Sequence, residues 1–248
     1  MYAAGFTDKG VTRNQNQDAI FVCNQHIGAL PNLFIVADGM GGHKAGDVAS
    51  DMAIKHFTGY IRDFKAQDFV TSENYLDLLM SAAKTADEKI AAKAASDEDM
   101  KGMGTTLTAC TITDDKIFYV HIGDSRAYAV NHFNMKQLTT DHTFVEELLR
   151  TGRISEEEAR THPKRNVITK VLGMPEGMEA DAKALDLGDA ASILLCSDGL
   201  SNMLEKESMM KIINGLGYVE HRTRYLIEEA NKNGGLDNIS AVLIDVNR

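Results

Sequence analysis

The chain has 248 residues, 44% of them hydrophobic, and a formal net charge of −10 that arises from 36 acidic and 26 basic residues. A chain of this length can bury a large core, and we expect one domain over residues 1–248. The acidic balance and the lack of a Lys/Arg cluster argue against nucleic-acid binding, and no segment approaches the ~20 apolar residues that would span a bilayer. An anionic substrate would need positive charge added locally, and metal ions are the obvious source.

The cysteines and the N-terminus bear on the compartment. Cys23, Cys110 and Cys196 lie in or beside strand-like runs without Cys-x-x-Cys spacing, so we expect buried thiols in a reducing environment. The N-terminus has neither a basic start nor a long apolar stretch. We therefore expect a cytoplasmic protein without membrane attachment.

Short apolar runs bounded by turns predict a series of strands. The predicted strands cover residues 19–23, 33–37, 105–113, 117–122, 126–130, 192–196 and 239–246. Tight acidic or glycine turns connect several neighbours, such as Asp114-Asp115 and Gly123-Asp124, and this favours antiparallel pairing.

Two long helical patterns lie between the second and third predicted strands. Apolar residues recur at steps of three and four over residues 49–64 and again over 76–90, which predicts two helices that can pack as an antiparallel pair. A third helical pattern, over residues 225–230, stops at Gly234-Gly235, a suitable C-terminal cap. Strands combined with segregated helices indicate an α+β layered domain.

The polar segment 140–173 interrupts the strand series. It contains the capping-box pattern Ser155-Glu156-Glu157-Glu158, which predicts the start of a short helix. We interpret the segment as an inserted flap, and a surface excursion without function is an equally good interpretation from sequence alone.

Aspartates at strand ends suggest the chemistry. Asp38 closes an apolar run and opens a glycine-rich turn, and Asp18, Asp198 and Asp237 stand at similar junctions. Such a carboxylate provides a rigid oxygen ligand, and an adjacent glycine lets the backbone carbonyl turn toward the same ion. A single Asp-Gly pair is an ordinary turn, but the recurrence predicts a metal site.

The absence of Cys or His at ligand spacing makes this an all-oxygen donor set, which selects the hard ions Mg²⁺ or Mn²⁺ with much bound water. Gathered carboxylates would raise one another's pKa values unless a cation neutralised them. Two ions about 3.5–4 Å apart can lower the pKa of a bridging water and hold it as hydroxide for in-line attack on phosphorus. Such a reaction needs no covalent intermediate.

A set of ordered motifs carries a family resemblance. The motifs are Arg13-Asn14-Gln15-Asn16-Gln17-Asp18, Ala37-Asp38-Gly39-Met40-Gly41-Gly42-His43, Gly102-Met103-Gly104-Thr105-Thr106, Gly123-Asp124-Ser125-Arg126, Ser197-Asp198-Gly199-Leu200 and Asp237-Asn238-Ile239-Ser240. From about residue 7 to residue 246 they resemble the metal-dependent serine/threonine protein phosphatases of the protein phosphatase 2C (PPM) family, particularly its compact bacterial branch. The resemblance implies a four-layer α-β-β-α sandwich of two antiparallel sheets flanked by helix pairs.

The resemblance also implies a ligand set for two core ions. Asp38 would bridge the two ions, and Asp198 and Asp237 would complete the first site. Asp18 and the carbonyl of Gly39 would contribute to the second. The ions would be Mn²⁺ or Mg²⁺.

Two further positions match the family pattern. Asp124 is similar to an aspartate that joins Asp198 around a third, looser ion, and the alternative is a turn residue that pairs locally with Arg126. Arg13 matches the arginine that binds the substrate phosphate, a task for which the fork of a guanidinium is well suited.

The chain departs from animal members of the family at Met40, where those proteins have a histidine proposed as general acid. Methionine cannot donate a proton, so the leaving group would be protonated by a metal-bound water or by another side chain. His43 and His142 are candidates, but each is more often expected to be a loop or supporting residue.

The implied function is hydrolysis of phosphoserine and phosphothreonine monoesters on proteins by a metal-bridged hydroxide. The implied partners are phosphorylated proteins and a cognate bacterial Ser/Thr kinase, and we expect a monomer. Two alternatives remain: a two-metal nuclease, which the acidic surface disfavours, and a catalytically weak phosphoprotein-binding scaffold. A cysteine-dependent phosphatase is excluded, because the residues six positions after the three cysteines are Ala29, Lys116 and Asn202 rather than arginine.

Overall fold

The computed structural model describes residues 1–41, 45–64, 74–175 and 177–246. It contains two sheets in which every neighbouring pair of strands is antiparallel, as the tight turns in the sequence indicated. The first sheet has the order β1 (Tyr2–Asp8), β11 (Ile239–Asp245), β10 (Ser192–Cys196), β7 (Arg126–Val130) and β8 (Met135–Gln137).

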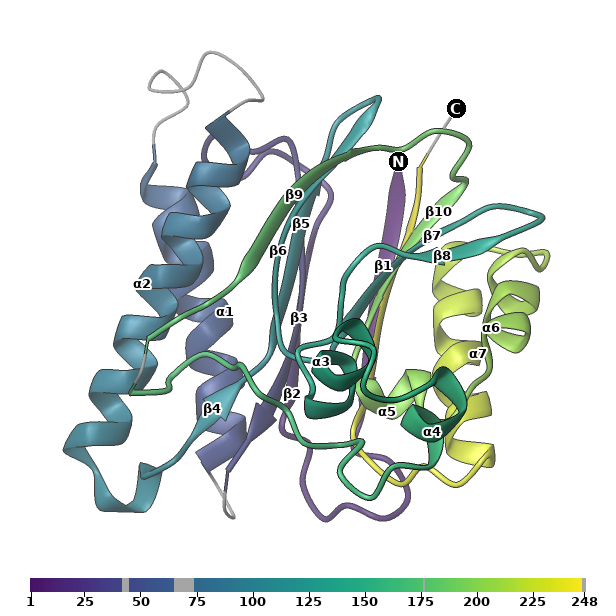
Figure 1. Cartoon of the computed structure of the whole chain (residues 1–248). Helices are drawn as coiled ribbons and strands as arrows, with labels where there is room; N and C mark the ends of the chain where they lie inside the picture. Colours follow the sequence, from purple (N-terminus) through teal and green to yellow (C-terminus); the bar gives the residue numbers. More distant parts are fainter. Residues whose placement is uncertain (42–44, 65–73, 176, 247–248) are drawn as a thin grey trace.

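The second sheet has the order β2 (Asp18–Cys23), β3 (Leu33–Met40), β5 (Leu107–Ile112), β6 (Lys116–Ile122) and β9 (Asp181–Asp186), and the short β4 (Gly104–Thr105) pairs with the end of β3. The two sheets face each other (Figure 1). Helices α1 (Ala45–Asp63) and α2 (Tyr75–Ser96) cover the outer face of the second sheet, while α6 (Lys206–Ile213) and α7 (Val219–Lys232) cover that of the first. The predicted four-layer α-β-β-α sandwich is confirmed.

Strand β3 is a continuous apolar run whose two faces pack in two different hydrophobic clusters. Successive side chains of a strand point to opposite faces. Leu33, Ile35 and Ala37 therefore pack in the cluster beneath α1 and α2, and Phe34 and Val36 pack in the cluster between the sheets. Both faces of the strand are buried, which is why its sequence lacks alternation with polar residues.

The predicted strand 105–113 is wrong in one respect, because the structure divides it into β4 and β5 at Thr106. The hydroxyl of Thr106 accepts a hydrogen bond from the N–H of Asp38 at 2.9 Å. The backbone N–H of Thr106 donates to the carbonyl of Asp38. The side chain thus replaces a backbone acceptor next to the motif that contains Asp38.

The helices extend the predicted patterns. The C-terminal helix α7 starts at Val219, six residues before the pattern noted in the sequence, and ends at Lys232. Gly234 and Gly235, with φ of 129° and 52°, follow it as predicted, and the N–H of Gly235 donates to the carbonyl of Ala230. A short 3-10 helix, η3 (Glu98–Met100), follows α2.

Segment 140–173 carries two short helices, α3 (Phe144–Arg150) and α4 (Glu156–Thr161), beside α5 (Asp198–Ser201) at one end of the sandwich (Figure 1). The predicted capping box is present, since Ser155 accepts from the N–H of Glu158 and the Glu158 carboxylate accepts from the N–H of Ser155. The end of the segment is fixed to α2, because the buried carboxylate of Asp87 accepts a 2.7 Å hydrogen bond from the N–H of Gly173.

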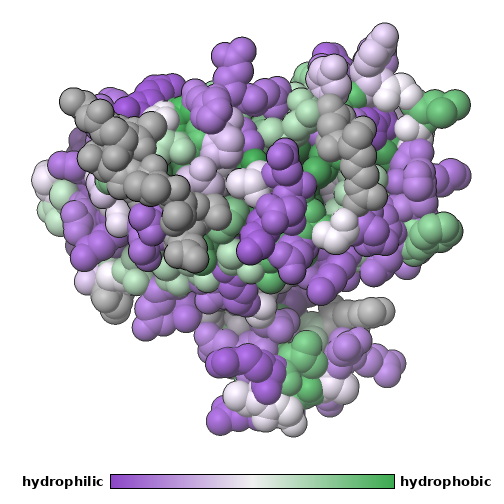
Figure 2. Space-filling model, turned by 90° about the horizontal axis from the view of Figure 1, so that it is seen from above, coloured by the Kyte–Doolittle hydropathy of each residue, from purple (hydrophilic) through white to green (hydrophobic). Residues whose placement is uncertain are grey.

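The surface at the end of the sandwich where β1 begins and β11 ends is mostly hydrophilic, with hydrophobic side chains scattered over it (Figure 2). None of the helices in the described ranges is long and apolar enough to cross a membrane. Cys110 and Cys196 are buried free thiols as predicted, whereas Cys23, on the edge strand β2, is partly exposed.

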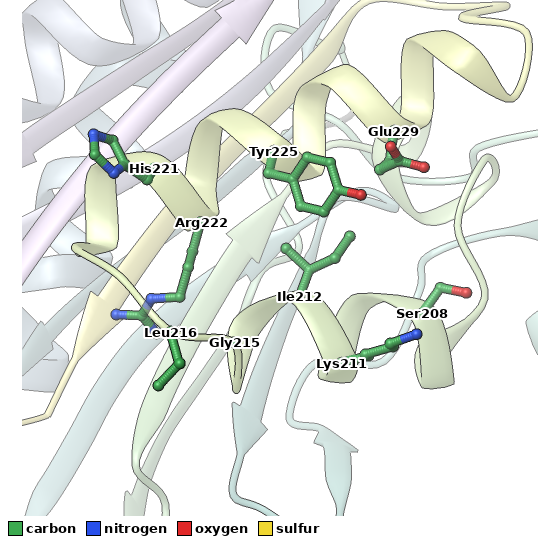
Figure 3. Close-up of a pocket in the computed structure, with 9 residues that line it drawn as sticks. All are labelled: Ser208, Lys211, Ile212, Gly215, Leu216, His221, Arg222, Tyr225 and Glu229. Carbon is green, nitrogen blue, oxygen red and sulfur yellow. The ribbon is translucent and has the colours of Figure 1, made fainter.

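A cavity of about 490 Å³ lies between α6 and α7, where the side chains of Ile212 and Tyr225 face each other (Figure 3). None of the aspartates predicted as metal ligands lines it. The candidate site lies elsewhere.

Candidate active site

The pairing of β2 with β3 sets two of the predicted aspartates opposite each other. Asp18 and Asp38 are register partners, so their side chains are neighbours across the strand pair. The backbone of Asp38 is held on both sides, because its N–H donates to Thr106 and its carbonyl accepts from the hydroxyl of Thr105 at 2.9 Å. Two carboxylates are therefore placed side by side on rigid backbone.

Gly39 permits a close approach of helix α1. An added Cβ at this position would lie 2.0 Å from the carbonyl oxygen of Gly46 and 2.5 Å from that of Gln17. No side chain fits there, and the N–H of Gly39 donates to the carbonyl of Gln17 at 3.1 Å. The glycine thus keeps the end of β3, the loop before β2 and the start of α1 together.

Asp18 is buried, with 8% of its surface exposed. Its Oδ2 accepts hydrogen bonds from Ser197 Oγ at 2.8 Å and Ser240 Oγ at 2.6 Å, while its Oδ1 has no partner. Burial raises the pKa of Asp18 to about 7, against the lowering effect of the two serines and with a further increase from Asp198 and Asp237. An unpaired carboxylate oxygen is costly to bury, and a cation would satisfy it.

Asp198 and Asp237 come from the first sheet. Asp198 begins α5, separated from the end of β10 by one residue, and Asn202 Nδ2 donates to its Oδ2 at 3.1 Å. Asp237 precedes β11, and its Oδ1 accepts from the N–H of Asn238 at 2.8 Å. The two junctions are packed together, because a Cβ on Gly199 would lie 2.0 Å from the carbonyl oxygen of Asn238.

Electrostatic coupling shows that all five predicted aspartates are near one another. The pKa of Asp38 lies well above its ordinary value, first because of burial and then because of four other carboxylates: Asp18, Asp198, Asp124 and Asp237. The pKa of Asp198 is raised to about 6 by burial and next by Asp237. Residues more than 200 positions apart in the chain thus form one acidic cluster.

Asp124 belongs to this cluster and does not pair locally. It is 6% exposed, its Oδ1 has no partner, and burial, followed by Asp198 and Asp141, raises its pKa to about 7. The alternative of local pairing with Arg126 is wrong. Arg126 forms a forked ion pair with Asp141, with Nη2 2.6 Å from Oδ2 and Nε 3.1 Å from Oδ1.

Arg13 lies on the loop before β2, where its side chain is 52% exposed. Its Nη2 is 2.8 Å from Asp237 Oδ2, so the predicted phosphate-binding cation contacts a predicted metal ligand. Exposed pairs of this kind add little stability. The contact therefore leaves the guanidinium available to a stronger anionic partner.

Two adjoining cavities of about 330 and 320 Å³ open at the cluster. Both cavities are lined by Asp198 and Asn202, at the start and the end of α5, and by Arg165 and Asn166 of segment 140–173. The predicted flap thus forms a wall of the site. Arg165 was not identified from the sequence, since nothing local in its segment marks it as facing the aspartates.

Several supporting residues were also missed. Asn238 donates from Nδ2 to the carbonyls of Lys9 and Gln15 and accepts the N–H of Gln17 at Oδ1. It thereby fastens the loop that carries Arg13 to the start of β11. The signal was present, because Asn238, Ser197 and Ser240 all lie inside the motifs that contain the aspartates.

Of the two histidines considered as proton donors, the structure describes only His142. His142 Nδ1 accepts the N–H of Gly123 at 3.2 Å, and its Nε2 lies 3.7 Å from Asp181. Burial lowers its pKa, and it lines neither cavity, so His142 supports the loop of Asp124. His43 lies outside the described residues.

The donor atoms fit a hard divalent cation. They are all oxygens, and two of them, Oδ1 of Asp18 and Oδ1 of Asp124, are buried without a partner. Within the described ranges, no group of three or more His, Cys, Asp or Glu side chains is already arranged to hold a metal ion. Mg²⁺ is commonly bound by only one or two carboxylates and keeps several waters, so the residues present fit a water-rich site.

Comparisons with known proteins identify similar chains. The family model described as "Protein phosphatase 2C" matches residues 11–235. The chain is 36% identical over 252 residues to the serine/threonine phosphatase stp of Listeria innocua. The alignment covers 100% of this chain and 96% of that relative.

Solved structures are also similar. The serine/threonine phosphatase of S. agalactiae superposes with a TM-score of 0.90 at 35% identity and covers 99% of this chain and 100% of that one. The catalytic domain of the serine/threonine protein phosphatase PstP, in complex with two manganese ions, superposes with a TM-score of 0.81 at 34% identity over 98% of this chain and 97% of that one.

Proposed function

Because the chain belongs to the protein phosphatase 2C family, we propose that it hydrolyses phosphoserine and phosphothreonine monoesters on proteins with divalent ions held by its aspartate cluster. It is a serine/threonine protein phosphatase, and its activity depends on divalent metal. The observation that carries the site assignment is the position of Asp38, opposite Asp18 across the strand pair and close enough to three more carboxylates for their charges to raise its pKa. Ionising such a cluster at neutral pH costs free energy, and compensating positive charge offsets that cost.

The proposed ligands divide between two core ions, Mn²⁺ or Mg²⁺. Asp38 would contact both, with Asp198 and Asp237 on one and Asp18 and the Gly39 carbonyl on the other. The cross-strand pairing of Asp18 with Asp38 supports this division. When bound, the ions would supply a nucleophilic water at neutral pH and neutralise charge on the phosphoryl group.

A third ion is proposed between Asp124 and Asp198. The support is that Asp124 is buried with an unpartnered Oδ1 and that Asp198 is the first carboxylate, after burial, to raise its pKa. Met40 has no proton to give, so we propose that water in the site protonates the departing serine or threonine oxygen.

The partners proposed are phosphorylated proteins and a cognate Ser/Thr kinase whose products this enzyme would reverse, and we propose that the enzyme acts as a cytoplasmic monomer. Segment 140–173 would influence which phosphoproteins dock, because Arg165 and Asn166 line both cavities at the site. The formal charge of −10 supports the choice of phosphoproteins over nucleic acid.

Substrate class can be tested directly. The proposal predicts that the protein with Mn²⁺ releases phosphate from a phosphothreonine peptide far faster than it cleaves a single-stranded oligonucleotide of equal concentration. A scaffold would instead bind the peptide in the presence of chelator and release no phosphate. Faster cleavage of the oligonucleotide would point to a nuclease.

Arg13→Ala is expected to raise KM for a phosphothreonine peptide by about 10- to 100-fold and to leave kcat within a few-fold of the wild type. The reason is that the change removes a charge-assisted contact to phosphate, worth about 1.5–3 kcal/mol, and leaves the nucleophile in place. Steady-state kinetics with saturating Mn²⁺ measure both constants. A collapse of kcat at unchanged KM would show that Arg13 does not act by binding phosphate.

A further inference from the structure

An exposed apolar surface adjoins the candidate phosphate site. We call it the ledge and define it by Val11, Met203 and Leu236. Leu236 is 60% exposed and Val11 is 68% exposed, whereas Met203 is partly buried. A single exposed leucine is common on a protein surface, and what distinguishes the ledge is its position beside the candidate phosphate site.

Two of the three ledge residues are part of the active-site wall. Leu236 and Met203 line the 320 Å³ cavity together with Arg13, Arg165 and Asp237. Leu236 directly precedes Asp237 in the chain, and Arg13 is bonded to that aspartate at 2.8 Å. A phosphate held by Arg13 would therefore lie next to apolar side chains on one side.

The backbone around the ledge is fixed in place. The N–H groups of Val11 and Thr12 donate to the carbonyl of Gly235 at 2.8 and 3.1 Å, and the carbonyl of Met203 accepts from Asn233 Nδ2 at 2.9 Å. Gly235 has φ of 52°, and an added Cβ would lie 2.8 Å from Val11 Cγ2. The ledge is thus a preformed surface, which lowers the entropic cost of binding.

We propose that the ledge selects phosphoprotein segments that carry a hydrophobic residue beside the phosphorylated serine or threonine. The inference rests on the proposed function and names a substrate class for the same site. Neighbouring residues of an extended peptide are about 3.3–3.6 Å apart along the chain, so a side chain next to the phosphorylated residue reaches a surface that borders the phosphate. Burial of an aliphatic side chain on Leu236 favours such substrates over those with a small or polar residue there.

The test uses phosphothreonine peptides that differ only in carrying Leu or Ser at the position before, or the position after, the phosphorylated residue. With the Mn²⁺-loaded wild type, Leu at one of the two positions is expected to raise kcat/KM about five- to tenfold over Ser, the range typical of partial burial of one aliphatic side chain. In Leu236→Ser this preference should fall below twofold. Because the preference is a ratio measured on one enzyme, it is independent of the fraction of active protein.

Phe133→Ser is the matched control, because Phe133 is 91% exposed on the β7–β8 turn and lines neither active-site cavity. It should keep the wild-type preference. Affinities of non-hydrolysable phosphonate versions of the peptides, measured by fluorescence anisotropy, should show the same ranking. Equal kcat/KM for Leu and Ser peptides in the wild type, or an unchanged preference in Leu236→Ser, would show that the ledge does not select substrates. Failure to hydrolyse any peptide overturns the proposed function as well.

Discussion

Asp38→Asn is expected to lower the turnover of a phosphothreonine peptide on the order of 10³-fold or more at saturating Mn²⁺. Asparagine keeps the shape of the side chain but removes the charge of the residue proposed to contact both core ions. Loss of several kcal/mol of transition-state stabilisation corresponds to a rate factor of this size. Asp237→Ala should act in the same way.

The loss should occur without unfolding. Burial and the acidic neighbours raise the pKa of Asp38, so the ionised carboxylate destabilises the folded metal-free protein. The neutral amide of asparagine removes this destabilisation. Thermal unfolding of metal-free Asp38→Asn should therefore occur no lower than that of the metal-free wild type at pH 7.5. Asp51→Asn, an equal charge change on the exposed face of α1, is the matched control and should keep full activity. Retention of more than a tenth of the activity in Asp38→Asn would contradict the proposed role.

Removal of divalent ions is expected to abolish hydrolysis, and Mn²⁺ or Mg²⁺ should restore it. Phosphopeptide turnover measured in parallel with EDTA, Mg²⁺ and Mn²⁺ tests this prediction. Activity that persists in EDTA would show that hydrolysis does not require divalent ions. The same removal should destabilise the fold, because the buried carboxylates then have no counter-charge.

The destabilisation has a defined pH dependence. The pKa of Asp18 is about 7 in the folded metal-free protein and 3.8 in its ordinary state, so the folded state binds more protons than the unfolded state between these values. The free energy of unfolding therefore falls as the pH rises from about 4 to 7, by on the order of 4 kcal/mol for Asp18 alone, and stays low above that range. The increase in Tm on adding Mn²⁺ should accordingly be larger at pH 8 than at pH 5. An equal increase at both values would be inconsistent with this.

Strands that are buried on both faces were among the parts of the fold that could be predicted. Strands such as β3 and β10 are continuous apolar runs because layers pack on either side. Strands β1 and β9 lie at sheet edges and are exposed or partly exposed at nearly every position, with sequences rich in Ala, Gly and Asp that have little strand preference. Only their long-range pairing, of β1 with β11 and of β9 with β6, makes them strands.

The site divides in the same way. Asp18, Asp38, Asp198 and Asp237 could be found because each stands where a predicted strand or helix meets a turn, and Asp124 because of its motif. Ser197, Ser240 and Asn238 act through contacts that span up to 229 residues, so no local pattern reveals their hydrogen bonds. The position of Arg165 depends on how segment 140–173 folds back on the sheets, which periodicity does not encode.

The most direct test of the central claim is anomalous diffraction from crystals grown with Mn²⁺. If the proposed ligands are right, manganese peaks will be enclosed by the carboxylates of Asp38, Asp18, Asp198 and Asp237, and a weaker peak will lie beside Asp124. Crystals that bind Mn²⁺ only at other surface carboxylates, with no peak in this cluster, would contradict it.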